Sequence, residues 1–131
     1  MGTADDAILA NKLGQLYQEI ATSLEDYLHV HAGELDKQDR DLLGKRVSNM
    51  LDFSDKFFSL SDQIAFAGSD DTFKGVVAAA QSAKAAIGHI AKVNKVISIS
   101  ADVITLAASI VMQNGPGVVG AVQSIVADAR N

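Results

Sequence analysis

The sequence contains no cysteine and no tryptophan, and proline occurs once in 131 residues. The lack of cysteine excludes disulfide scaffolds, zinc–thiolate sites, iron–sulfur clusters and cysteine nucleophiles. One proline together with 48% hydrophobic residues is typical of a folded helical chain and not of a disordered one. At this length we expect one domain, residues 1–131, with a core that needs neither metal nor disulfide.

Basic residues are also scarce. The chain has 11 Lys and Arg against 16 Asp and Glu, which gives a net charge of -5 and a pI near 4.9. A nucleic-acid ligand requires a basic surface to neutralise phosphates, so the composition excludes nucleic acid as the main partner. The first residues show no basic segment followed by an apolar run, which predicts no signal peptide and, by default, a soluble cytoplasmic protein.

Glycines divide the chain into helical segments. Gly33, Gly68 and Gly115 each follow a long apolar-periodic stretch and precede a helix-start signal. Within each stretch apolar residues recur every three or four positions, which keeps them on one face of a helix. The pattern predicts an all-α, mostly antiparallel bundle of four to five helices without strands. The expected helices cover residues 4–32, 37–67, 70–113 and 116–129, and Leu51, Phe57 and Phe58 are expected to point into the core.

The segment 70–113 has the longest repeat. Its apolar seam runs from Phe73 to Val111 in steps of three and four, and a second apolar stripe begins at Val96. Unbroken, this helix would be about 20 Å longer than the first two. We therefore predict a long third helix that bends or breaks near 94–100, where β-branched and serine residues lower helix propensity, and a short C-terminal helix. Without a break, a second copy, another protein or lipid would have to cover the overhang.

Asn94 is the one polar residue in this seam. In a continuous helix it would fix the register of packing, as a buried asparagine does in coiled coils. In a helix that bends there, its side chain would bond to free backbone groups. We favour the bend.

No arrangement of residues indicates catalysis or metal binding. His29 and His31 are two residues apart, so they point to different sides of a helix and cannot share a metal with Glu34. No phosphate-binding loop or nucleophile motif is present. We therefore predict no enzyme activity, no cofactor and no metal.

Charge is distributed unevenly. Residues 1–71 contain 14 acidic and 6 basic residues, whereas residues 72–131 contain 2 acidic and 5 basic ones. Lys84, Lys92 and Lys95 fall on one side of a helical wheel and form a basic edge. This edge either lies beside the acidic helices of the same bundle or attracts an anionic protein or lipid surface.

The second apolar stripe and the last helix together carry more apolar surface than a three-helix core can cover. We therefore predict a non-enzymatic interaction module with a binding, neutralising or signalling role, whose partner is another protein or a second copy. The predicted interaction surface consists of Val96, Ile99, Val103, Leu106, Ile110, Val119, Val122 and Val126.

The alternative is a membrane-active protein whose apolar hairpin, residues 96–127, inserts into a bilayer. Seventeen residues from Val96 to Met112 span about 25 Å, less than a hydrocarbon core of about 30 Å. Asp102 adds about 2.5 to 3.5 kcal/mol to insertion. These values disfavour a permanent transmembrane helix but allow a releasable hairpin. An acidic hairpin followed by an apolar one is similar in layout to helical pore-forming or cell-death domains.

Overall fold

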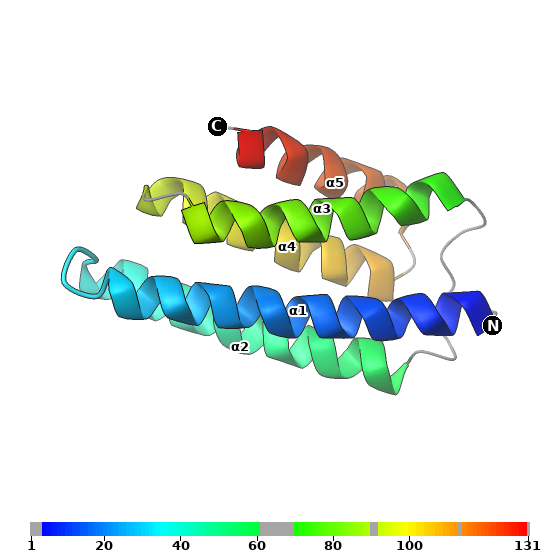
Figure 1. Cartoon of the computed structure of the whole chain (residues 1–131), viewed down its shortest axis with the longest axis horizontal. Helices are drawn as coiled ribbons and strands as arrows, with labels where there is room; N and C mark the ends of the chain where they lie inside the picture. Colours follow the sequence, from blue (N-terminus) through cyan, green and yellow to red (C-terminus); the bar gives the residue numbers. More distant parts are fainter. Residues whose placement is uncertain (1–3, 61–69, 90–91, 113, 131) are drawn as a thin grey trace.

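The computed structural model describes residues 4–60, 70–89, 92–112 and 114–130, and this part of the chain forms five α-helices (Figure 1). They are α1 (Ala4–Val30), α2 (Lys37–Ser59), α3 (Asp70–His89), α4 (Val93–Val111) and α5 (Gly115–Arg130). Consecutive helices run in opposite directions along the long axis of the molecule. The all-α, antiparallel bundle expected from the sequence is confirmed.

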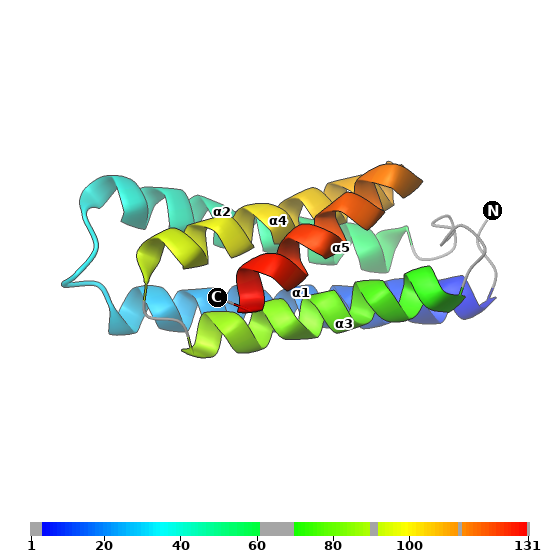
Figure 2. The same cartoon turned by 90° about the horizontal axis from the view of Figure 1, so that it is seen from above.

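Four of the helices surround the core and the fifth lies outside them. α1 packs against α2 and α3, and α4 packs against α2 and α3 on the other side. α5 lies over α3 and α4, as both views show (Figure 2). α4 therefore has neighbours on three sides, which satisfies the need of a strongly apolar helix for cover on more than one face.

Large side chains fill the core between α1 and α2. Tyr17 is fully buried, and its ring meets that of Phe57 edge-on, with 5.2 Å between the ring centroids. The Tyr17 hydroxyl donates a hydrogen bond of 2.6 Å to the Val103 carbonyl of α4. The expectation that Leu51 and Phe58 also point inward is wrong, because both are more than a third exposed. Adjacent residues lie about 100° apart around a helix, so the Phe57 ring enters the core while the Phe58 ring lies at its edge, over Gly14 of α1.

The predicted long third helix and short C-terminal helix are also wrong, because the last three helices have similar lengths. α3 ends at His89 and α4 begins at Val93, which gives helices of 20 and 19 residues, and α5 has 16. The chain turns back before the stretch 94–100, so α4 becomes the fourth helix of the bundle and leaves no overhang. Lys92 is the N-cap residue of α4 and makes no capping hydrogen bond with its side chain.

The buried residues of α4 do not continue the apolar seam that is buried in α3. In α3 the buried residues include Val76, Ala80, Ala83 and Ile87, which belong to the expected seam. In α4 the continuation of that seam is only partly buried, and the second stripe is the core face instead. Asn94 is exposed in the first turn of α4, so it lies outside the buried seam.

Within the described residues, α4 is long and apolar enough to cross a membrane, with a mean hydropathy of 1.4. It lies far from the N-terminus, and nearly half of it is buried inside the bundle. A compact bundle that partly encloses its most apolar helix is consistent with a soluble protein.

Candidate interaction surfaces

The predicted apolar interaction surface is divided between the core and the exterior. Its five α4 members, Val96, Ile99, Val103, Leu106 and Ile110, are at most 2% exposed and form part of the protein's own core. On α5, Val122 and Val126 are partly buried. Val119 is 48% exposed and is the member that a partner can reach most easily.

Other large apolar side chains are exposed near one end of the bundle. Ile8 lies near the start of α1, Phe58 near the end of α2, and Met112 just after α4. These three helix ends lie at the same end of the molecule (Figure 1). Val30 is exposed at the opposite end, where α1 finishes.

Phe58 is held at the surface by a close approach of α2 to α1. Its ring covers Gly14, where an added Cβ atom would come within 2.8 Å of the ring. The buried Ser54 hydroxyl donates a hydrogen bond of 2.6 Å to the Gly14 carbonyl and ties the two helices together at this point. A side chain at position 14 would displace the ring from this place.

The Phe58 ring borders a shallow hollow on the outside of α1 and α2. We call this hollow the Ile8–Phe58 surface; its lining residues are Ile8, Asn11, Lys12, Gln15, Gln18 and Phe58. Two apolar side chains thus flank a row of amides with one cation. This surface was not predicted from the sequence, because Phe58 was expected in the core; Gly14, next to the apolar seam of α1, was a signal of close helix contact.

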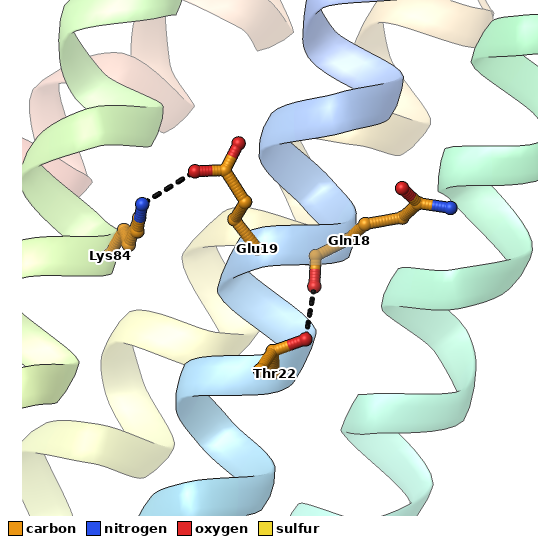
Figure 3. A network of polar contacts seen from close by, with 4 residues as sticks. All are labelled: Gln18, Glu19, Thr22 and Lys84. Atoms are coloured by element: carbon orange, nitrogen blue, oxygen red, sulfur yellow. Dashed lines mark hydrogen bonds and ion pairs between the residues drawn. The ribbon is translucent and has the colours of Figure 1, made fainter.

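The predicted basic edge does not lie on one helix, because Lys84 is on α3 whereas Lys92 and Lys95 belong to the start of α4. Lys84 forms an ion pair of 2.5 Å with Glu19 of α1 (Figure 3). Lys84 of the basic edge therefore lies beside α1, an acidic helix of the same bundle. Lys92 is exposed and Lys95 is partly buried.

The histidine-containing segment makes local contacts. The His31 ring stacks on Tyr27 with 4.3 Å between centroids, and its Nδ1 atom lies 2.8 Å from Glu34 Oε2. Burial, and next the charge of Glu34, raise the pKa of Tyr27. Among the residues that the structure describes, no three histidine, aspartate or glutamate side chains are placed to hold a metal ion.

Two acidic side chains meet where α4 and α5 pack. Asp102 is partly buried in the middle of α4, and its Oδ2 atom is buried without a hydrogen-bond partner among the described residues. Burial, followed by a hydrogen bond and repulsion from Asp128 of α5, raises the pKa of Asp102 to about 7. The sequence reasoning treated Asp102 only as an obstacle to membrane insertion and did not consider Asp128.

Comparisons with known protein families, curated protein sequences and solved structures find no match to this chain.

Proposed function

We propose that this protein is a non-enzymatic helical interaction module that binds a protein partner, or a second copy of itself, through apolar side chains that its own fold leaves exposed. The observation that carries the proposal is the Phe58 ring, which is held over Gly14 at the surface next to exposed Ile8. An exposed aromatic ring is a typical anchor of protein interfaces because it buries a large apolar area when it binds.

The surroundings of this ring support the same function. The neighbouring Asn11, Gln15 and Gln18 side chains offer hydrogen-bond donors and acceptors without adding charge. Hydrogen-bonding groups beside exposed apolar side chains are the usual composition of a reversible interface. The burial of the five predicted α4 residues moves the proposed contact from the C-terminal hairpin to the Ile8–Phe58 surface, with Val119 as an accessible residue near the same end.

The variant Ile8→Asp tests this function. Ile8 is 64% exposed, so the substitution leaves the core intact, and an acidic residue is tolerated near a helix N-terminus. Val30→Asp is the matched control because Val30 is 72% exposed at the opposite end of α1. We expect a partner bound by the parent protein and by Val30→Asp to be lost in Ile8→Asp, as measured by affinity capture followed by mass spectrometry.

Self-association is measured on the same three proteins by light scattering over a range of concentrations. A dimer that dissociates in Ile8→Asp identifies the second copy as the partner. A chain that stays monomeric and captures no protein in an Ile8-dependent manner would contradict the proposed function.

A second candidate is membrane insertion by the hairpin of residues 96–127. It is favoured by the length and apolar character of α4 and by the raised pKa of Asp102, because a neutral carboxyl group enters a bilayer at lower cost than a charged one. Thr105 is exposed on α4, so Thr105→Lys adds a charge to the hairpin without disturbing the folded bundle.

Dye release from vesicles tests this candidate. If the hairpin inserts, the parent protein permeabilises phosphatidylglycerol vesicles at pH 5, and Thr105→Lys reduces the release by at least about tenfold. Gln18→Lys on α1 is the matched control, because it changes the net charge equally outside the hairpin. Absence of vesicle association in flotation assays between pH 5 and 7.5 would remove this candidate.

A further inference from the structure

The two acidic residues of the second half of the chain lie against each other. Residues 72–131 contain five basic residues but only Asp102 and Asp128 as acids. Either carboxylate could have been placed beside a lysine or arginine. The fold instead brings them together across the contact between α4 and α5.

The helix geometry explains how they meet. Val118, Ala121 and Ile125 are the buried residues of α5, and Asp128 continues the same series of steps of three and four. Asp128 therefore belongs to the face of α5 that packs on the bundle. Asp102 precedes the buried Val103 in the middle of α4, and the two helices run antiparallel (Figure 2).

Cations from the helices on the other sides of α4 make other contacts. On α2, Arg46 donates a hydrogen bond of 3.3 Å to the Ser100 hydroxyl, and Ser100 lies about 200° around α4 from Asp102. On α3, Lys84 pairs with Glu19 of α1.

The remaining titratable groups near the pair lie toward its ends or on the opposite side. His89 of α3 and Arg130 of α5 line a hollow between these two helices, which Asp128 does not line, and Lys95 lies two turns before Asp102 on the same side of α4. The α1 group that reaches α4 is the neutral Tyr17 hydroxyl, which donates to Val103. Among the described residues, Asp102 Oδ2 has no hydrogen bond to any of these groups.

We propose that Asp102 and Asp128 share one proton, and that this proton holds α5 against α4. A protonated Asp102 donates a hydrogen bond to the Asp128 carboxylate, and such a bond to a charged acceptor is stronger than one between neutral groups. Loss of the proton leaves two like charges facing each other and a buried oxygen without a donor. The α4–α5 contact is therefore a proton-dependent latch.

The direction of the pH dependence follows from the pKa of Asp102, which is about 7 in the folded protein against an ordinary value of 3.8. The folded state binds more protons than the unfolded state between these two values. The stabilisation that Asp102 contributes to the folded state is therefore complete below pH 4 and is lost as the pH rises through about 7. This protein is expected to hold α5 more tightly in mild acid than in mild alkali.

Thermal unfolding of the parent protein, Asp102→Asn and Asp52→Asn between pH 5 and pH 8.5 tests the latch. We expect the Tm of the parent to fall by about 3 °C or more over this range and the fall to be absent in Asp102→Asn. Asp52 is an exposed carboxylate on α2, so Asp52→Asn retains the parental slope. An Asp102→Asn variant with the full parental slope would overturn the proposal.

Two measurements on the parent protein remain decisive even if Asp102→Asn does not fold. The side-chain carboxyl carbon of Asp102, followed by NMR, should titrate near pH 7, and a midpoint near 4 would overturn the proposal. Amide hydrogen exchange, corrected for its intrinsic pH dependence, should show α5 losing about tenfold more protection than α1 between pH 6 and 8.5. Equal losses in the two helices would contradict a latch located at α5.

Discussion

The N-terminal hairpin α1–α2 and the C-terminal helices α3 to α5 are stabilised by different side chains. The hairpin buries large residues, among them Tyr17, Leu24, Met50 and Phe57, and carries most of the acidic residues of the chain. α3 buries Ala79, Ala80, Ala83 and Ala86, and the second half of the chain has few charges. Large side chains stabilise through the apolar area that they bury, whereas small ones let helices approach closely.

This difference predicts opposite sensitivities in the two regions. The hairpin should be most sensitive to the loss of volume. When a large central ring is removed, its neighbours relax only partly and a cavity remains. The α3 seam should be most sensitive to the gain of volume, because its alanines are buried against the neighbouring helices. Substitutions that remove or add volume in each region test this difference.

The largest effect is expected for Phe57→Ala. Phe57 is completely buried and its ring contacts Tyr17, so its removal leaves a cavity at the centre of the hairpin. We expect the free energy of unfolding to fall by about 3 to 5 kcal/mol, measured by urea denaturation. Phe58→Ala is the matched control and should have a smaller effect, because its ring is 38% exposed. Equal losses for the two variants would show that the hairpin core is not centred on Phe57.

A smaller loss is expected for Ala83→Leu. Ala83 is fully buried on α3, which packs against α1, α4 and α5. The added three carbon atoms must displace a neighbouring helix, which should lower the free energy of unfolding by about 1 to 3 kcal/mol in the same assay. Ala85→Leu, at an exposed position of α3, is the control and should change stability little. A neutral Ala83→Leu would mean that the small-residue seam is loosely packed.

The sequence predicted the helical class and the inner faces of α1 and α3, because Leu13, Ile20, Ala80 and Ala83 follow steps of three and four. It did not predict where the third helix ends. The reason is that the apolar repeat in the sequence continues from α3 into α4, because both helices face the same core. The informative signal was the second stripe that begins at Val96, which marks a new helix with a different buried face and not an extra surface on the old one.

The candidate surfaces were harder to predict, because they depend on contacts between distant segments. Gly14 and Phe58 are 44 positions apart, and their contact decides that the ring lies at the surface. Asp102 and Asp128 each look like an ordinary solvated acid in the sequence, and their meeting depends on how α5 packs on α4. Charge counting located the acid-poor half of the chain but could not show that its two acids face each other.

Ser54→Ala should have a moderate effect. The Ser54 hydroxyl is buried and donates to Gly14 across the α1–α2 contact. Its loss should lower the free energy of unfolding by about 0.5 to 1.5 kcal/mol in chemical denaturation. Ser59→Ala removes a hydrogen bond of similar type, to the Asp55 carbonyl, but at an exposed site within one helix. Similar losses in both variants would show that the bond between helices has no special role.

The smallest effect is expected for Asn94→Ile, and here the structure separates two interpretations that the sequence left open. A buried Asn94 that fixes register would make Asn94→Ile more stable and alter the size of the assembly, whereas a capping Asn94 would make it less stable by about 0.5 to 2 kcal/mol. Asn94 is exposed, and Lys92 is the N-cap residue of α4. Since an exposed side chain with neither role contributes little, we expect a change within about 0.5 kcal/mol and an unchanged mass by light scattering. A larger change of either sign would show that Asn94 makes a contact in solution that this arrangement of α3 and α4 does not contain.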